Sequence, residues 1–221
     1  MTNKFKVCTV VQGKTLETFL NNLKKAQGTA NMIELRADSI CDIRLENIGT
    51  LRLATELPSI FTYRHESEGG LYSGTIKKQT EFLKKAFDSG FKYVDASIGN
   101  PILTKLTIKE KKQLLLSYHN MTQTPDLTEL EAILLKMRPI KPAIIKIATL
   151  VREAKDITTL TKLLSERNRN EKMVVIGMGE MGSVTRTSFL KLGSYITFVQ
   201  MKGEESIARG MLTIDELNKT L

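Results

Sequence analysis

Pro-Ala-Ile-Ile-Lys-Ile-Ala-Thr-Leu, residues 142–150, is a nearly continuous apolar run with one lysine, Lys146, in its middle. Such a run is typical of a parallel strand that is buried on both faces. Burial disfavours a charged amine, so we expect Lys146 to lose proton affinity relative to a free lysine and to become a nucleophile for ketones. The alternative interpretation is a lysine that extends to water or pairs with a carboxylate.

Other apolar or β-branched runs recur along the chain at fairly even spacing. Together with the run around Lys146 they predict eight strands: 6–11, 32–37, 59–64, 93–97, 114–118, 143–149, 173–178 and 195–201. Segments with apolar residues at helical spacing lie between most of them. Thr124 and Pro125 predict the N-cap and first position of one helix, which ends at 138–139, and another extends from near Thr75 to Gly90.

The regular alternation of strand and helix, with no linker or low-complexity tract, predicts an α/β fold, a single-domain (β/α)8 TIM barrel spanning residues 1–221. The competing architecture is an open doubly wound sheet. That fold usually has a glycine-rich phosphate turn after its first strand, where this chain has only Gly13.

Composition excludes several classes of function. No apolar stretch reaches the roughly 18 to 20 residues of a membrane helix, and no signal-peptide core precedes the first predicted strand, so we expect a cytoplasmic protein without membrane contact. The chain has only two histidines and two cysteines, and the cysteines lack CxxC spacing, which argues against a metal site. We expect both cysteines to be unpaired thiols.

The net charge of +9 raises the possibility of nucleic-acid binding. The lysines, however, occur in pairs over predicted helices, with acidic residues nearby and without interleaved aromatic residues. We interpret them as a solvated surface and expect no nucleic-acid partner. A net positive charge would also attract a small anionic substrate.

Polar residues at the ends of the predicted strands are the candidates for chemistry, because barrel enzymes bind their substrates at the carboxyl ends of the strands. Alternation places Glu34 and Arg36 on the inner face of the second strand, while Arg64 closes the third. The loop after the seventh strand leads to Arg186. Taken alone, Glu34 and Arg36 would be interpreted as a structural ion pair.

His119 follows the fifth strand, and Lys146 lies on the sixth. Taken alone, His119 would be a hydrogen-bonded core residue, but on neighbouring strands the two side chains can reach one small ligand. A base, an amine nucleophile and anion-binding arginines together predict imine chemistry on a polyhydroxylated keto acid.

Five motifs of the chain, in order, resemble those of the type I 3-dehydroquinate dehydratases of the shikimate pathway. The resemblance covers nearly the whole chain, and it rests on motifs from five of the predicted strands. They are Glu34-Leu-Arg36-Ala-Asp38; Thr62-Tyr-Arg64 with Glu68-Gly-Gly70; Ser117-Tyr-His119-Asn with Thr124-Pro125; Ile145-Lys146-Ile-Ala; and Met178-Gly-Glu-Met-Gly182-Ser-Val-Thr-Arg186.

The resemblance implies a reaction and a role for each matching residue. Lys146 would form a Schiff base with the ketone of 3-dehydroquinate, and His119, oriented by Glu68, would be the general acid and base. The products would be 3-dehydroshikimate and water, and the reaction would need no metal or organic cofactor. The resemblance also implies that the enzyme is a homodimer. The implied substrate-binding residues are Glu34, Arg36 and Arg64 at the ring hydroxyls, Arg186 at the carboxylate and Met178 beside the ring.

The last loop departs from the family pattern. A lid with the sequence Ser-Ala-Pro-Gly-Gln is expected there, whereas this chain has Ile-Ala-Arg-Gly-Met at 207–211. Met211 cannot supply the hydrogen bonds of a glutamine amide, so we expect Arg209 to substitute in closing the lid over the substrate.

Two other functions stay open. A Schiff-base (class I) aldolase on the same barrel would explain Lys146 but not the context of His119 and Arg186. A noncatalytic basic protein that binds nucleic acid, or that serves as a scaffold for partners, would explain the net charge but none of the residues at the strand ends.

Overall fold

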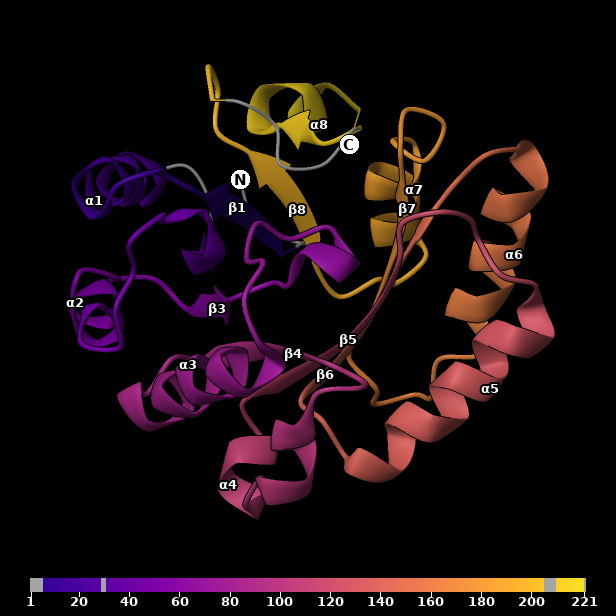
Figure 1. Ribbon diagram of the computed structural model, residues 1–221. Coiled ribbons are helices and arrows are strands. Elements are labelled where there is room, and N and C mark those ends of the chain that lie inside the picture. Colours follow the sequence, from indigo (N-terminus) through magenta and orange to yellow (C-terminus); the bar gives the residue numbers. More distant parts are fainter. Residues whose placement is uncertain (1–5, 29–30, 205–209, 221) are drawn as a thin grey trace.

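A parallel sheet of nine strands, curled into a barrel, forms the centre of the computed structural model, which describes residues 6–28, 31–204 and 210–220 (Figure 1). The strand order is β7-β6-β5-β4-β3-β2-β1-β8-β9. All eight predicted strands are present, and the short β9 is an addition. The strands are β1 Val7–Val11, β2 Met32–Arg36, β3 Ser59–Thr62, β4 Tyr93–Ser97, β5 Leu114–Asn120, β6 Ile144–Leu150, β7 Met173–Met178, β8 Thr197–Gln200 and β9 Leu212–Thr213.

Helices surround the sheet on its outer side (Figure 1). They are α1 Leu16–Ala26, α2 Asn47–Leu53, α3 Ile76–Ser89, α4 Ile108–Lys111, α5 Leu127–Met137, α6 Ala154–Ser165, α7 Thr185–Lys191 and α8 Ile214–Thr220. The predicted limits of α3 are confirmed. The Thr75 hydroxyl accepts a hydrogen bond from the Lys78 amide at 3.2 Å, and Gly90 ends the helix with a left-handed φ of 81°.

The predicted start of α5 is wrong by two residues. Asp126, not Thr124, is the N-cap, and its carboxylate accepts from the Glu129 amide at 2.8 Å. The Thr124 hydroxyl instead contacts the Thr149 hydroxyl at 2.8 Å and donates to the Leu150 carbonyl at 2.9 Å. Thr124 therefore fastens the loop after β5 to the end of β6.

Alternation along the strands separates two apolar cores. Ile33 and Leu35 of β2 and Ile147 of β6 belong to the core between barrel and helices, whereas Met32 and Ala148 belong to the barrel interior. Because neighbouring residues of a strand point in opposite directions, Glu34 and Lys146 point into the barrel. The inward orientation predicted for Glu34 is confirmed.

The seam between β7 and β8 closes the barrel without a ladder in the described part of the chain. At its amino end, the Tyr195 amide donates to the Met173 carbonyl at 2.8 Å. Towards the other end, Arg186 of α7 donates from Nη1 to the Phe198 carbonyl of β8 at 3.2 Å. The seam therefore positions one of the arginines that the sequence singles out.

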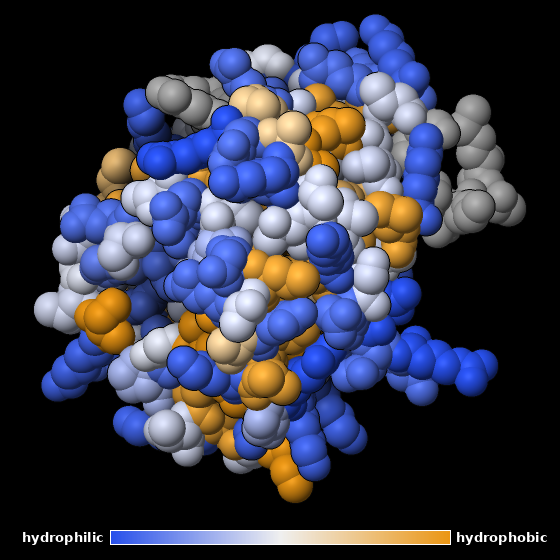
Figure 2. Space-filling model, turned by 90° about the vertical axis from the view of Figure 1, so that its right-hand side faces the viewer, coloured by the Kyte–Doolittle hydropathy of each residue, from blue (hydrophilic) through white to orange (hydrophobic). Residues whose placement is uncertain are grey.

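On the surface seen in Figure 2, apolar side chains lie in separate groups among charged ones. None of the helices within the described ranges is long and apolar enough to cross a membrane. Cys8 is buried and Cys41 is exposed, and both thiols are free, as predicted.

Candidate active site

A cavity at the carboxyl ends of the strands collects most of the side chains that the sequence singles out. Its empty space measures about 590 Å³, part of it open to solvent. Arg209 falls outside the described residues. The other nine predicted site residues all line the cavity: Glu34, Arg36, Arg64, Glu68, His119, Lys146, Met178, Arg186 and Met211.

Lys146 projects from β6 into the cavity and is only 6% exposed. Its surroundings are more polar than the apolar sequence around it indicates. Nζ lies 3.4 Å from Asp95 Oδ2, 3.8 Å from Glu34 Oε1 and 4.5 Å from the centre of the Phe198 ring. Two buried carboxylates and one aromatic face therefore hold the ammonium group in a single place.

Asp95 of β4 is a site residue that the sequence analysis missed. It is fully enclosed, and it contacts the guanidinium of Arg64, the ammonium of Lys146 and the hydroxyl of Ser117, which donates to Oδ1 at 2.6 Å. Burial alone would raise the pKa of Asp95, but the charges of Arg64 and Lys146 and the hydrogen bonds from Ser117 and Arg64 hold it below its usual value. Asp95 is therefore an anion at neutral pH.

Arg36 and Arg64 are buried guanidinium groups with carboxylate partners inside the protein. Arg36 donates from Nε and Nη2 to both oxygens of Asp38, at 2.9 and 2.6 Å. Arg64 contacts Asp95, and its Nη1 lies 3.5 Å from Glu68 Oε2. The interpretation of Glu34 and Arg36 as an ion pair is wrong, because Arg36 pairs with Asp38 instead.

Glu34 has a second contact that fixes its carboxylate. The Thr62 hydroxyl on the adjacent strand donates to Oε1 at 2.8 Å. The same oxygen lies near Lys146, so Thr62 and Lys146 together hold Glu34 at the wall of the cavity.

Arg186 differs from the other two arginines. It is 4% exposed, and no carboxylate of the described residues lies within 4 Å of it. Its Nε donates to the Gly210 carbonyl at 2.8 Å and its Nη1 to Phe198. Burial lowers the pKa of Arg186 to about 10, against a smaller opposing effect of the Glu34 charge. A buried cation without a counter-ion at a cavity wall is suited to an anionic ligand.

His119 lies at the end of β5 with its ring in the cavity wall. Burial, with the positive charges of Arg64, Lys146 and Arg36 adding to it, lowers the pKa of His119 well below its ordinary value. The imidazole is therefore neutral at neutral pH, as a general base must be. Its Nδ1 is buried without a hydrogen-bond partner among the residues that the structure describes.

Glu68 does not orient His119 in this structure. Its carboxylate accepts a short hydrogen bond from the Ser97 hydroxyl and faces Arg64. Ser97 also accepts from Arg64 Nη1 at 3.2 Å, so the three side chains form one cluster beside the cavity. Glu68 and His119 share the cavity wall, and no hydrogen bond joins them.

The segment that precedes β9 reaches the cavity through Met211, and the carbonyl of Gly210 beside it contacts Arg186. Gly210 has a left-handed φ of 75°, and a Cβ atom there would lie 2.1 Å from the Gly179 carbonyl oxygen. Glycine is therefore required at this position. Met211 lines the cavity. Arg209, the proposed substitute for the lid glutamine, lies outside the described residues.

Met121 and Phe198 also line the cavity and were not predicted. They add apolar surface to the cavity wall. Among the described residues, no three His, Cys, Asp or Glu side chains gather in a way that could hold a metal ion.

A parallel barrel with a buried lysine, a neutral histidine and an unpaired arginine at its carboxyl end defines an enzyme of the (β/α)8-barrel class. Comparison with known proteins narrows this class. A sequence model described as type I 3-dehydroquinase matches residues 7–221. The chain therefore belongs to the type I 3-dehydroquinase family, whose members are hydro-lyases.

Individual relatives agree with this assignment. A 3-dehydroquinate dehydratase of Coxiella burnetii (strain CbuK_Q154) is 39% identical over 204 residues, which cover 92% of this chain and 87% of that protein. A 3-dehydroquinate dehydratase of Methanococcus vannielii is 30% identical over 220 residues, or 97% of this chain and 98% of the other.

The fold is that of solved structures from the same family. The 3-dehydroquinate dehydratase of Geobacillus kaustophilus HTA426 superimposes with a TM-score of 0.86 at 23% identity, covering 98% of this chain and 89% of that one. The (β/α)8 barrel expected from the sequence is thus confirmed.

Proposed function

We propose that the enzyme dehydrates 3-dehydroquinate to 3-dehydroshikimate through a Schiff base on Lys146. Family membership and the names of the relatives support the substrate and the reaction. One observation carries the proposal: the buried amine of Lys146, the neutral imidazole of His119 and the unpaired guanidinium of Arg186 line a single cavity. Imine chemistry on a keto acid needs these three groups.

Arg186 binds the substrate carboxylate in this proposal. Arg36 and Arg64 are already neutralised by Asp38 and Asp95, whereas Arg186 has carbonyl oxygens as its partners. The carboxylate of the substrate would supply the missing negative charge in a site where a charged hydrogen bond is strong. This contact fixes the direction in which the substrate ring enters the cavity.

Lys146 then forms the covalent intermediate. Its ammonium group first gives a proton to the neutral imidazole of His119, and the resulting amine attacks the ketone carbon. The imidazolium returns that proton to the hydroxyl of the carbinolamine, which leaves as water while the nitrogen becomes an iminium. The iminium withdraws electrons from the adjacent carbon and acidifies its C–H bond. Asp95 and Glu34 lie within 4 Å of Nζ, so their negative charges stabilise the positive nitrogen of this intermediate.

His119 moves the protons. It removes the proton of the acidified C–H bond, and the electron pair expels the β-hydroxyl as the new double bond forms. The imidazolium then donates its proton to the departing hydroxyl, so that water leaves. Hydrolysis of the iminium releases 3-dehydroshikimate and regenerates the amine of Lys146.

The remaining side chains of the cavity bind the substrate ring and shape the cavity around it. We assign the ring hydroxyls to Glu34, Arg36 and Arg64, with Glu68 held beside them by Arg64 and Ser97. Met178 and Met211 provide apolar walls, and Arg209 would contribute to closure over the substrate. No metal or organic cofactor takes part in the proposed steps.

We further propose that residues 1–221 act as one catalytic domain in the cytoplasm, as a homodimer, without nucleic acid or membrane as a partner. Light scattering coupled to size-exclusion chromatography tests the dimer. The alternative function, a class I aldolase, differs from the dehydratase in the bond that is made. An aldolase would form a carbon–carbon bond between an aldehyde and the enamine carbon of the intermediate on Lys146.

A turnover assay tests the proposed function. The product is a conjugated enone, so ultraviolet absorbance should rise when 3-dehydroquinate is added. Lys146→Ala should abolish the rise, because it removes the nucleophile. The fold should persist, because Asp95 keeps Arg64 as a partner and Glu34 keeps Thr62. Lys155→Ala is the matched control, since this lysine lies on the surface of α6 and is 76% exposed. Wild-type turnover by Lys146→Ala would refute the imine mechanism.

A further inference from the structure

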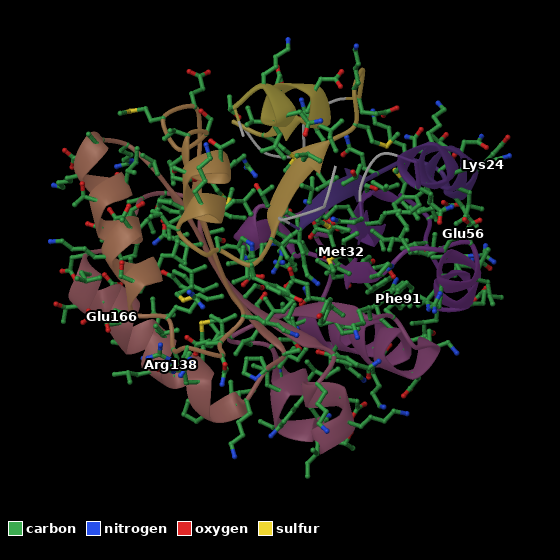
Figure 3. The ribbon with its side chains drawn as sticks, turned by 180° about the vertical axis from the view of Figure 1, so that it is seen from behind. Lys24, Met32, Glu56, Phe91, Arg138 and Glu166 are labelled. Carbon is green, nitrogen blue, oxygen red and sulfur yellow. The ribbon has the colours of Figure 1, made fainter. Side chains whose placement is uncertain are left out.

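The opposite end of the barrel, where the strands begin, carries a group of lysines that we call the lysine arc. Each precedes a strand by one to three residues, and each is exposed. In Figure 3 this end is marked by the labelled Met32, at the start of β2, and Phe91, two residues before β4. The arc consists of Lys6, Lys92, Lys112, Lys141 and Lys172.

Sheet topology brings these lysines together. Lys92, Lys112, Lys141 and Lys172 precede β4, β5, β6 and β7, which are consecutive neighbours in the sheet. Lys6 completes the arc across the seam, because its carbonyl accepts from the Thr197 amide of β8 at 3.0 Å. The arc therefore follows the rim from β4 to β1, past six of the eight barrel strands.

The arc encloses a hollow. Lys92, Lys112, Lys141 and Lys172 line one depression together with Tyr93, and its empty space is about 530 Å³, part of it open to solvent. No carboxylate lines this hollow within the described ranges.

Tyr195 lies beside the hollow, at the rim between β7 and β8. The Nζ atoms of Lys6 and Lys172 lie 4.8 and 5.2 Å from the centre of its ring. Partial burial alone would raise the pKa of Tyr195, but the neighbouring Lys6, Tyr93 and Lys172 lower it. The rim is therefore a place of positive potential.

The charges of the arc are not neutralised by the protein. Within the residues that the structure describes, none of the five ammonium groups lies within 4.0 Å of a carboxylate. Glu171, next to Lys172 in the sequence, pairs instead with Arg138 at 3.0 Å. Lys84 of α3 shows the usual arrangement, with Asp88 and Glu110 at 2.7 and 2.8 Å.

We propose that the lysine arc binds a compact, multiply charged phosphate anion such as triphosphate. Ammonium groups bind phosphate oxygens as point charges, and several of them around one hollow favour a ligand of high charge density. A nucleic-acid backbone fits less well, because it needs an extended basic track, whereas four of these lysines line one hollow. The site is separate from the active site, which lies at the other end of the barrel.

Calorimetric titration of the full chain with inorganic triphosphate tests the proposal. We expect one binding site whose affinity falls as salt is added. The triple variant Lys112→Gln/Lys141→Gln/Lys172→Gln should bind at least about tenfold more weakly, because three charges next to the ligand are lost. The matched control removes three exposed lysines of α3, as Lys77→Gln/Lys78→Gln/Lys85→Gln, and should retain wild-type affinity.

Both triple variants lose the same net charge, so the comparison separates a local site from general attraction. Equal weakening of the two variants would overturn the proposal, and so would the absence of binding to wild-type protein at millimolar triphosphate. Tighter binding of a short DNA duplex than of triphosphate would also overturn it. Amide chemical shifts of the wild-type protein locate the ligand without any variant: triphosphate should move Lys92, Lys112, Lys141 and Lys172 and leave α3 unchanged.

Discussion

Asp95→Asn is the substitution that most directly tests the electrostatic design of the active site. It keeps the shape of the side chain but removes the negative charge that Arg64 and Lys146 share. The amide oxygen can still accept from Ser117. The change therefore isolates the charge of Asp95 from its packing.

The expected magnitude follows from the geometry. One ammonium–carboxylate pair at the 3.4 Å that separates Lys146 from Asp95 is worth about 5 kcal/mol at an effective dielectric constant of about 20. Removing one partner of a buried pair typically costs about 3–5 kcal/mol of unfolding free energy. Glu34 and Glu68 remain near the two cations, so we expect the lower end, about 3 kcal/mol. For a chain of this size, Tm should fall by roughly 6–12 °C.

Urea unfolding of the wild type and the variant at pH 7 measures the loss. The pKa of Asp95 is lower in the folded than in the unfolded state, so its stabilising charge is fully present above the unfolded pKa of about 3.9. The difference between wild type and variant should shrink as pH falls through the folded pKa. Ser117→Ala, which removes a neutral hydroxyl that donates to Asp95 and accepts from Arg64, is the control and should cost about 1–2 kcal/mol. A loss no larger than that of Ser117→Ala would refute the account of Asp95.

Four further predictions concern catalysis. His119→Ala should lower kcat by about 10²–10⁴-fold while imine formation on Lys146 persists, and an unchanged kcat would remove His119 from the mechanism. Because the pKa of His119 is well below 6.5, kcat/KM should show no fall centred near pH 6.5 on the acid side; a half-maximal rate there would mean that the ring is solvated. Arg186→Ala should lower kcat/KM by about 10- to 100-fold, with Arg186→Lys intermediate, and equal rates in all three proteins would exclude the carboxylate contact. Arg209→Ala should raise KM more than the control Arg169→Ala does, and an unaltered KM would exclude Arg209 from the lid.

The strands could be predicted from the sequence because parallel barrel strands are buried on both faces and form continuous apolar runs. Lys146 was conspicuous for that reason, as a charge inside such a run. Asp95 lies inside the shorter and more polar run Tyr-Val-Asp-Ala-Ser at 93–97, where a single charge stands out less than Lys146 does in its long apolar run.

Other contacts depend on residues that are distant in the sequence and could not be predicted. Thr124 is a residue type that often forms an N-cap, but its hydroxyl contacts Thr149 on the next strand, 25 positions away in the sequence. Glu68 was expected at His119, yet Ser97 and Arg64 hold its carboxylate. Side-chain partners across strands follow from strand register and curvature, which local patterns do not specify.

The lysine arc is a surface feature that could not be predicted from local sequence patterns either. Each of its members looks like an ordinary surface lysine, and pairs such as Lys111-Lys112 indicated a solvated helix. Only closure of the barrel places Lys6 in one rim with Lys172 and Lys92. Total charge therefore predicted neither the grouping nor its location.

The central claim is that Lys146 forms a covalent imine with the substrate. The most direct measurement is to incubate the enzyme with 3-dehydroquinate, reduce it with borohydride, and determine the intact mass and the modified peptide. The account predicts one ligand adduct per chain on the peptide that contains Lys146, and none in Lys146→Ala. An adduct on another lysine, or turnover to 3-dehydroshikimate without any adduct, would contradict it.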